Sequence, residues 1–201
     1  SEGTHTLNFY SNDSFNNLDY KNVTFRADLT SPAVVLNAPL DNSYLNYQNN
    51  IYFNYTATDS NGIDTCKLYG NWTGSFAVNY TWVKPNNATQ NFTIVNITTD
   101  NPYIWNVECN DTLSNKAFAL NNLTFTIDTV PPVISIDTIT TTTDSKAVSF
   151  NSSYTEVNCN NSFYSVLTSA GAIENLIENV SLSCNNMNSS FTVSDYATYN
   201  L

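Results

Sequence analysis

The sequence repeats itself with a period of about 100 residues, and this internal repeat constrains the fold more than any other feature. The stretch NVTFRADLTSPAVVL at 22–36 recurs as NLTFTIDTVPPVISI at 122–136. Just before it, HTLNFYSNDSFNN at 5–17 recurs as YIWNVECNDTLSN at 103–115. A period of this length suits one small domain, so the chain is predicted to be a tandem array of similar modules.

The phase of the repeat divides the chain into three parts. The closing residues, ATYNL at 197–201, align with GTHTL at 3–7, so the chain begins and ends at the same point of the period. The pattern predicts one complete module at 30–129. It is preceded at 1–29 by the C-terminal strands of an earlier module, a candidate donor segment, and followed at 130–201 by a module that lacks its last strand or strands. We expect the missing strands from a neighbour, either in trans or along a longer chain.

Apolar and polar residues alternate along short segments of the complete module, which is the pattern of half-buried β-strands. In IYFNYTATD, for example, Ile51, Phe53 and Tyr55 share one face. Strands are expected near 33–37, 51–58, 64–70, 76–83, 91–97, 103–109 and 122–128. Short alternating strands at this spacing predict an all-β fold of immunoglobulin-like β-sandwich modules in tandem, with the terminal modules incomplete. One stretch, AGAIENLIENV at 170–180, is helix-like.

The four cysteines form an even set without a metal-type C-x-x-C pair, and we interpret them as two disulfides formed in an oxidising, extracellular compartment. Cys66 and Cys109 alternate in phase with inward-facing neighbours, so they are expected to pair within the core of the complete module. Cys159 and Cys184 then form the second pair. The alternative is four buried free thiols.

The charge of the chain is low and acidic, since 6 Lys+Arg and 17 Asp+Glu give a net charge of −11. Six scattered cations cannot form the basic patch that nucleic acid requires, which argues against a nucleic-acid partner. No apolar run approaches membrane-spanning length, so no membrane span is expected in this segment. The single histidine, His5, stands where the repeats place tyrosine, and no second candidate base accompanies it. We therefore predict no catalytic residues, no cofactor and no enzymatic activity.

Glycosylation motifs of the form N-x-S/T are the clearest functional signal in the sequence. They begin at Asn12, Asn22, Asn54, Asn71, Asn79, Asn87, Asn91, Asn96, Asn110, Asn122, Asn151, Asn160, Asn179 and Asn188. Polar–apolar–polar alternation in an Asn- and Thr-rich strand also generates N-x-T without any selection for glycans. The same alternation leaves the asparagine on the outer face, where a glycosyltransferase can reach it. N-linked glycans are therefore expected on several of these sites.

The segment DSNGID at 59–64 resembles an oxygen-ligand loop for calcium, with Asp59, Asn61 and Asp64 as candidate ligands. No bidentate glutamate follows at the spacing of a full calcium loop, and a tight Asn-Gly turn explains the same residues. The sequence therefore predicts no metal site, with this loop as a weak calcium candidate.

The complete module resembles the immunoglobulin-like repeats that occur in tandem in large archaeal cell-surface proteins. The resemblance is carried mainly by FNYTATD at 53–59, NWT at 71–73, WNVECND at 105–111 and LTFTID at 123–128. In that family such modules are spacers, adhesive stalks or parts of surface layers, and they have no common catalytic residues. The resemblance implies an extracellular or cell-surface location and a structural role, and it transfers no catalytic residue.

These observations leave two functional hypotheses. The first is a structural subunit of a glycosylated extracellular filament or surface stalk. Its identical subunits would assemble head to tail by β-strand complementation, with residues 20–29 of one chain pairing with the 130–201 part of the next. The second is a two-repeat fragment of a long cell-surface adhesin or surface-layer protein. Such a protein could bind surface glycans or other cells through exposed aromatic side chains, for which the candidates are Tyr44, Tyr47, Tyr69 and Trp72.

Overall fold

The structure is a computed structural model, and it divides into two compact units, Ser1–Thr129 and Val130–Leu201. It describes residues 1–201 except 84, 86, 87, 140–146, 157, 169–179, 185–187, 193–198 and 201, and the side chains of 93–95, 167, 168, 199 and 200 also lie outside the description. The helix-like stretch at 170–180 falls outside the described residues, apart from Val180. The described part contains no helix that is long and apolar enough to cross a membrane.

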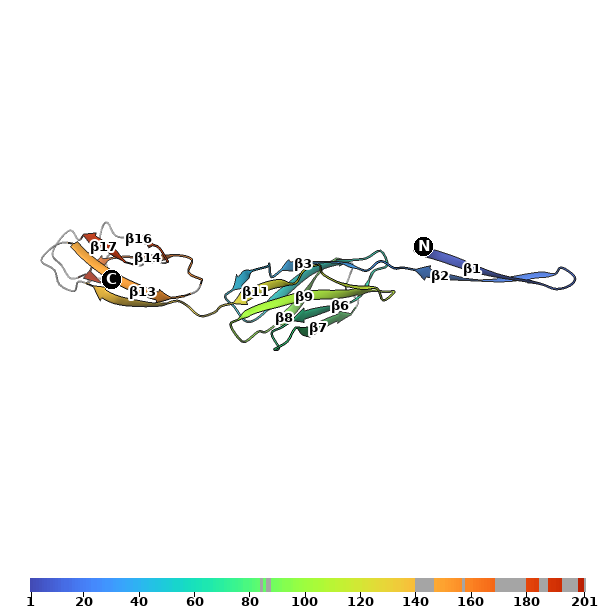
Figure 1. Ribbon diagram of the computed structural model, residues 1–201, viewed down its shortest axis with the longest axis horizontal. Coiled ribbons are helices and arrows are strands. Elements are labelled where there is room, and N and C mark those ends of the chain that lie inside the picture. Colours follow the sequence, from blue (N-terminus) through green and yellow to red (C-terminus); the bar gives the residue numbers. More distant parts are fainter. Residues whose placement is uncertain are drawn as a thin grey trace. The chain divides into compact units, whose positions relative to one another are not determined.

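All secondary structure in the described residues is β-strand, which confirms the predicted all-β class. In chain order the strands are β1 (Gly3–Asn12), β2 (Leu18–Ala27), β3 (Ala33–Ala38), β4 (Ser43–Leu45), β5 (Ile51–Thr58), β6 (Ile63–Gly70), β7 (Ala77–Val83), β8 (Thr89–Val95), β9 (Pro102–Asp111), β10 (Lys116–Phe118), β11 (Leu123–Ile127), β12 (Val133–Ile139), β13 (Ala147–Thr155), β14 (Ser162–Tyr164), β15 (Leu167–Thr168), β16 (Val180–Leu182), β17 (Ser189–Thr192) and β18 (Tyr199–Asn200) (Figure 1). The seven strands predicted between 33 and 128 correspond to β3, β5, β6, β7, β8, β9 and β11. The sequence did not reveal β4 and β10, because three residues are too few to establish an alternation.

Strands β3 to β11 form a two-layer sandwich. One layer is the three-stranded sheet β3-β5-β8, and the other is the sheet β4-β11-β9-β6-β7, in which β10 also pairs with β9. Neighbouring strands are antiparallel except β4 and β11, which run parallel. The chain therefore crosses repeatedly between two packed sheets, with β3, β5 and β8 in one and the remaining strands in the other, and this is the arrangement of the predicted immunoglobulin-like sandwich.

The core of the sandwich lies between the two sheets and is largely aromatic. Alternate residues of β5, among them Phe53 and Tyr55, are completely buried because a strand turns every second side chain to the same face. The ring of Phe53 lies 5.0 Å from that of Trp105 and 5.7 Å from that of Phe125, edge to face in both cases. Burying one such side chain contributes about 1.5–3 kcal/mol. Phe53 therefore ties the smaller sheet to β9 and β11 of the larger one.

Strands β1 and β2 form a two-stranded antiparallel hairpin. Its turn is closed by Asp13, whose Oδ1 accepts hydrogen bonds from the backbone amides of Phe15 and Asn17 at 2.9 Å each. Asp13 Oδ2 accepts a further bond from Asn17 Nδ2 at 2.8 Å. Asn16 takes the left-handed conformation that the turn requires, with φ 64°, which asparagine tolerates well.

The turn between β9 and β10 contains the same three side-chain hydrogen bonds at the equivalent residues. Asp111 Oδ1 accepts from the amides of Leu113 at 2.8 Å and Asn115 at 2.9 Å, and Asp111 Oδ2 accepts from Asn115 Nδ2 at 2.9 Å. Ser114, with φ 74°, occupies the left-handed position. The sequence repeat therefore extends to the individual hydrogen bonds of its turns.

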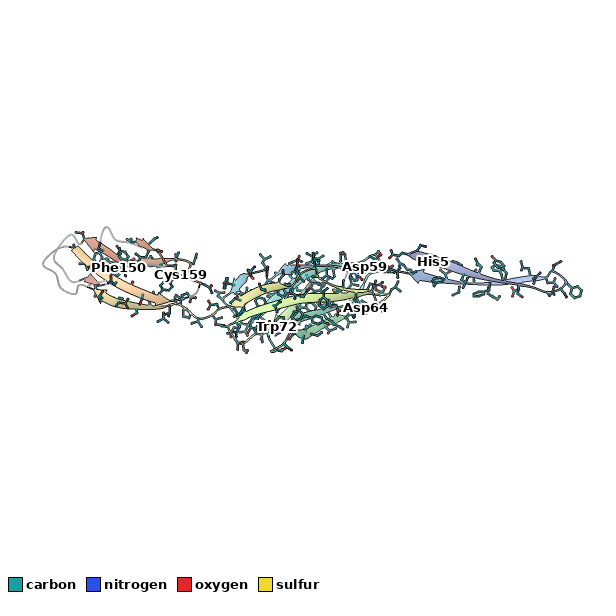
Figure 2. The ribbon with its side chains drawn as sticks, viewed as in Figure 1. His5, Asp59, Asp64, Trp72, Phe150 and Cys159 are labelled. Atoms are coloured by element: carbon teal, nitrogen blue, oxygen red, sulfur yellow. A yellow bond between two sulfur atoms is a disulfide. The ribbon has the colours of Figure 1, made fainter. Side chains whose placement is uncertain are left out.

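The described part of the unit Val130–Leu201 contains the three-stranded sheet β12-β13-β17 and the strand pairs β14-β16 and β15-β18. The order β12-β13-β17 is that of β3-β5-β8 in the sandwich. Phe150 on β13 packs edge to face on Tyr164 at 5.0 Å, and Phe191 lies 6.5 and 6.1 Å from these two rings (Figure 2). Phe150 and Val166 are buried, so this aromatic cluster forms part of the core of the unit in its described residues.

Candidate functional site

The hairpin has the same strand register as the pair β9–β11 of the sandwich. Leu7 lies opposite Val23, and at the equivalent positions of the repeat Trp105 lies opposite Leu123. Because side chains alternate between the two faces of a strand, an identical register assigns equivalent residues to equivalent faces. One face of the hairpin therefore corresponds to the side of β9 and β11 that faces the core.

In the sandwich this face is buried, whereas on the hairpin it is open. Trp105 is 0% exposed and Phe125 is 1% exposed. Their equivalents on the hairpin, Leu7 and Phe25, are 48% and 50% exposed, and Phe9 on the same face is 58% exposed. Contiguous exposed apolar side chains of this kind are typical of an interaction surface. We call the face made by Leu7, Phe9 and Phe25 the open hairpin face.

The single histidine lies on the open hairpin face. The ring of His5 stacks on that of Phe25 with 5.5 Å between centroids, and its Nε2 donates a hydrogen bond to the carbonyl oxygen of Ser1 at 2.8 Å. Tyr103, at the equivalent position of the sandwich, contacts Phe125 in a similar way, with 5.6 Å between ring centroids.

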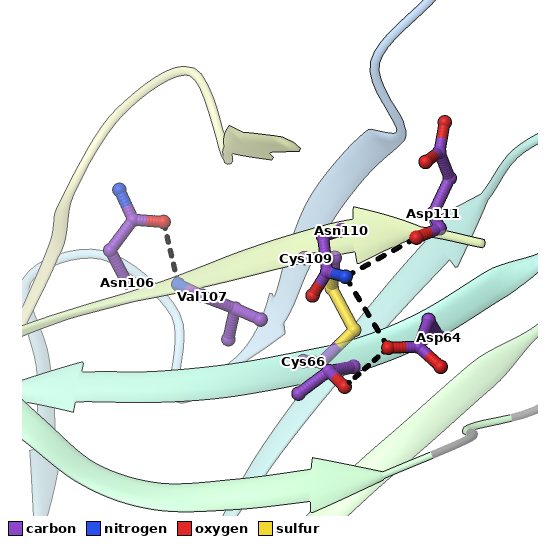
Figure 3. Close-up of a disulfide and its surroundings, with 8 residues drawn as sticks. Asp64, Cys66, Asn106, Val107, Cys109, Asn110 and Asp111 are labelled. Atoms are coloured by element: carbon purple, nitrogen blue, oxygen red, sulfur yellow. Dashed lines mark hydrogen bonds between the residues drawn. A yellow bond between two sulfur atoms is a disulfide. The ribbon is translucent and has the colours of Figure 1, made fainter. Parts of the chain in front are cut away.

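The structure joins the cysteines in the two pairs that the sequence predicts, Cys66–Cys109 and Cys159–Cys184. Cys66 on β6 lies directly opposite Cys109 on β9, and both are completely buried (Figure 3). This bond therefore links neighbouring strands of one sheet, unlike the disulfide of antibody domains, which crosses between the sheets. Cys159 and Cys184 are half-buried.

Of the candidate calcium ligands, Asp59 belongs to a group of converging carboxylates and Asp64 does not. Asp64 Oδ2 accepts hydrogen bonds from Thr65 Oγ1 at 2.9 Å and from Asn110 Nδ2 at 3.4 Å (Figure 3). Asp59 Oδ1 instead accepts a bond from the backbone amide of Asn61 at 2.7 Å, as in a tight turn. The turn explanation therefore accounts for the contact between Asp59 and Asn61.

Two acidic residues that the sequence did not single out lie beside Asp59. One carboxylate oxygen each of Asp28, Asp59 and Asp111 lie within 4.8 Å of one another. The only signal for them in the sequence was their recurrence, since Asp28 is repeated as Asp128 and Asp111 as Asp13. We call Asp28, Asp59 and Asp111 the aspartate cluster.

The pKa of Asp111 lies below its ordinary value of 3.8. Burial raises it, but the hydrogen bonds that Asp111 accepts from Asn115 and from the amide of Leu113, together with its side-chain hydrogen bond to Asp28, lower it by more.

The glycosylation motifs differ in the exposure of their asparagines. The exposed ones are Asn12, Asn22, Asn91, Asn96, Asn122, Asn151, Asn160 and Asn188. The half-buried ones are Asn54, Asn71, Asn79 and Asn110, while Asn87 and Asn179 lie outside the described residues. A glycan is attached at Nδ2, and Asn79 uses this atom to donate to the carbonyl oxygens of Gly70 at 2.9 Å and Ala77 at 2.8 Å. The Nδ2 atom of Asn54 similarly donates to Asn91 Oδ1 at 2.6 Å. The Nδ2 atoms of Asn54 and Asn79 therefore form hydrogen bonds that stabilise the sandwich.

The aromatic candidates for glycan stacking also separate into two kinds. The ring of Trp72, labelled in Figure 2, is half-buried and packs against the sandwich core, stacking on the ring of Phe53 with 5.0 Å between centroids. Tyr69 is half-buried and donates a hydrogen bond to Glu108 Oε2 at 3.2 Å. The rings of Tyr44 and Tyr47 are exposed.

No protein-family model matches the chain, and no curated protein matches it. Among solved structures it is similar to the fibronectin(III)-like modules of Clostridium thermocellum CbhA, with 7% identity, 81% of this chain and 80% of that chain covered, and a TM-score of 0.44. It is similar to a tetra-tandem repeat in the extending region of a large adhesion protein, with 18% identity, 96% of this chain and 49% of that chain covered, and a TM-score of 0.42. It is also similar to dimeric latent PorU from Porphyromonas gingivalis, with 12% identity, 96% and 21% covered, and a TM-score of 0.38. The chain thus spans about half the length of the second structure and about a fifth of the third.

Proposed function

We propose that this chain is a structural subunit of an extracellular filament or surface stalk, in which the hairpin of one copy completes the unit Val130–Leu201 of the next copy. The observation that carries the proposal is the open hairpin face, which repeats the register of a strand pair that the sandwich buries. An exposed apolar face is stabilised when a complementary sheet covers it. The expected partner is a half-module like the one that covers β9 and β11.

The unit Val130–Leu201 is such a half-module in its described residues. Its sheet β12-β13-β17 has the strand order of β3-β5-β8, the layer that faces β9 and β11 across the sandwich core. Phe150 on β13 holds the position that Phe53 holds on β5. Phe53 is the residue that contacts both Trp105 and Phe125.

Docking by the same geometry would bring equivalent residues together. Leu7 and Phe25 of the hairpin stand where Trp105 and Phe125 stand in the sandwich. They would therefore pack on Phe150 of the neighbouring copy. The donor and acceptor surfaces lie in different parts of the chain, so the contact is heterologous, and its repetition generates an open filament.

Main-chain hydrogen bonds would add to this packing. In the sandwich β9 lies between β11 and β6, and in the unit Val130–Leu201 the strands β14 and β15 stand at the position of β6. β18 occupies two residues of that edge by pairing with β15. β1 of the neighbouring copy would extend the same edge along β14, which is the strand-addition mode of recognition.

A matched pair of substitutions on adjacent residues of β1 tests the assembly. Leu7→Asp places a charge on the open hairpin face, and Asn8→Asp places the same charge on the opposite face. We expect the unmodified chain and Asn8→Asp to form elongated, concentration-dependent assemblies in light scattering and electron microscopy, and Leu7→Asp to stay monomeric. Assembly of Leu7→Asp to the same extent would refute the proposal, as would an unmodified chain that stays monomeric at high micromolar concentration.

The second hypothesis is distinguished by the mass of the native protein. In a long adhesin or surface-layer protein, a preceding repeat of the same polypeptide would cover the open hairpin face. The native protein would then have a mass far above that of this chain with its glycans.

Two features support an extracellular location. The chain has two disulfides, and disulfides persist in oxidising compartments. Eight of its described sequon asparagines are exposed. Mass spectrometry of the native protein before and after removal of N-linked glycans tests this location, and a native protein with reduced cysteines and no glycan would contradict it.

A further inference from the structure

The aspartate cluster gathers residues from three separate segments. Asp28 follows β2, Asp59 follows β5 and Asp111 ends β9. Asp111 is 1% exposed and Asp59 is 9% exposed, so two of the three carboxylates are withdrawn from water. Neither Asp28 nor Asp111 forms an ion pair with Lys or Arg among the described residues. Buried carboxylates that converge in this way destabilise one another unless a cation or a proton neutralises them.

A neutral oxygen beside the cluster provides a second, independent observation. Asn61 Oδ1 is completely buried and accepts no hydrogen bond within the described part of the chain. Asn61 itself contacts two of the aspartates, because its Nδ2 donates to Asp28 Oδ2 and its backbone amide donates to Asp59 Oδ1. Its own carbonyl oxygen accepts from Thr112 Oγ1 at 2.9 Å, next to Asp111. A buried oxygen without a donor destabilises the folded state, and a cation in the cluster would remove this cost.

Comparison with the turn of the hairpin separates the role of Asp111 in its own turn from its role in the aspartate cluster. Asp13 makes the same turn hydrogen bonds as Asp111, yet it lies on an exposed surface. The turn therefore needs one carboxylate. It does not need the approach of Asp28 and Asp59, which occurs only at Asp111.

The geometry points to a Ca²⁺ site in which Asp28, Asp59 and Asp111 supply carboxylate oxygens and Asn61 supplies its amide oxygen. Ca²⁺ takes oxygen ligands at about 2.3–2.6 Å, so ligand atoms on opposite sides of the ion stand about 4.6–5.2 Å apart. The spacing of 4.8 Å or less within the aspartate cluster fits inside this limit. The ligands are all hard oxygens, which favour Ca²⁺ over zinc and other soft metals.

The site would fasten the segment between the hairpin and the sandwich. Asp28 lies between β2 and β3, and its carbonyl oxygen already accepts a hydrogen bond from Asn115 Nδ2 at 3.1 Å. A cation held jointly by Asp28, Asp59 and Asp111 would join this connecting segment to the loops that follow β5 and β9. Calcium would then stiffen the junction between successive modules, whether or not the open hairpin face takes part in assembly.

Calorimetric titration of the metal-free 201-residue chain with CaCl₂ tests the site. We expect one saturable site with a Kd of about 10⁻⁴–10⁻³ M, the range of extracellular calcium modules. Asp28→Asn and Asp59→Asn each remove one ligand charge and are expected to weaken binding roughly tenfold or more. Both substitutions keep an oxygen for the local hydrogen bonds.

Two control variants remove the same single charge elsewhere. Asp13→Asn alters the matching turn of the hairpin, and Asp64→Asn alters a residue of β6 that lies outside the aspartate cluster. Both are expected to bind Ca²⁺ as the unmodified chain does. A thermal-shift measurement gives a second readout, in which Ca²⁺ raises the Tm of the controls but not that of Asp28→Asn or Asp59→Asn.

Three results would overturn the inference. One is a chain without a saturable site at millimolar Ca²⁺. Another is unchanged binding in both Asp28→Asn and Asp59→Asn. The third is an equal loss in Asp13→Asn, which would show diffuse attraction of Ca²⁺ to an acidic chain.

Discussion

The disulfide between β6 and β9 permits a quantitative prediction for the sandwich. The perturbation is the double substitution Cys66→Ala with Cys109→Ala, which opens a cross-link between residues separated by 43 positions. Loop-closure entropy for a separation of this length is about 4 kcal/mol. A small domain is stable by about 5–15 kcal/mol, so the loss is a large part of the total. The expected fall in Tm is about 15–30 °C for a domain of this size.

Tryptophan fluorescence is the assay, because it reports the sandwich alone. The three tryptophans of the chain all belong to the sandwich, since Trp72 follows β6, Trp82 lies on β7 and Trp105 lies on β9. Urea unfolding of the oxidised unmodified chain and of the double variant, followed by this signal, gives the difference in the free energy of unfolding. A difference below about 1 kcal/mol would refute the loop-closure argument.

The two disulfides should also differ in their reaction with a reductant. Cys66 and Cys109 are completely buried, whereas Cys159 and Cys184 are half-buried. A thiolate must reach a sulfur atom to exchange with it, so under native conditions dithiothreitol should open Cys159–Cys184 first. Alkylation followed by peptide mass spectrometry measures the order. Equal rates for the two pairs would show that the burial of Cys66 and Cys109 does not protect them.

Further expectations concern the core, the glycans and the acid stability. Trp72→Ala should lower the free energy of unfolding by about 3 kcal/mol, since it removes a ring stacked on the core. Denaturant unfolding measures this difference. A loss under about 1 kcal/mol would show that Trp72 does not contribute to the core. In a host that glycosylates N-x-S/T, peptide mapping should find glycan on Asn96 and none on Asn79, and the reverse would contradict the role of Asn79 Nδ2 in the fold. Hydrogen bonds from the amide and hydroxyl of Thr124 hold the pKa of Asp41 below its ordinary 3.8. The stabilisation from Asp41 is therefore complete above pH 3.8 and is lost as the pH falls through the lower folded value. Asp41→Asn should flatten this acid decline in a pH series of thermal unfolding, and an unchanged decline would exclude Asp41 as its source.

The strands and the inward-facing side chains were predictable from sequence, because both depend on residues that are close together in the chain. The alternation in β5 shows that Phe53 and Tyr55 lie on the same, inward face of the strand, because side chains alternate between the two faces from one residue to the next. The disulfide partners followed from the same argument, since a cysteine in phase with core residues needs a partner on the same inward face. The short strands β4 and β10 escaped prediction because their pairing, and not their composition, makes them strands.

The candidate site was less predictable, because its residues come together only through the topology. Asp59 and Asn61 were recognisable as part of a loop with calcium-type ligands. Asp64, their neighbour in the sequence, turns instead to Thr65 and Asn110. No local pattern indicates that Asp28 and Asp111 lie beside Asp59.

The sequence by itself determined the all-β class, the module period and the likeness between the hairpin and the pair β9–β11. These properties are encoded by local alternation and by repetition along the chain. The tertiary structure alone decided which equivalent residues are buried, since Trp105 and Leu7 share one position of the repeat but only Trp105 is covered by an opposing sheet. It also decided which acidic residues meet. Burial and convergence depend on segments that are far apart in the chain, and a local pattern carries no information about such contacts.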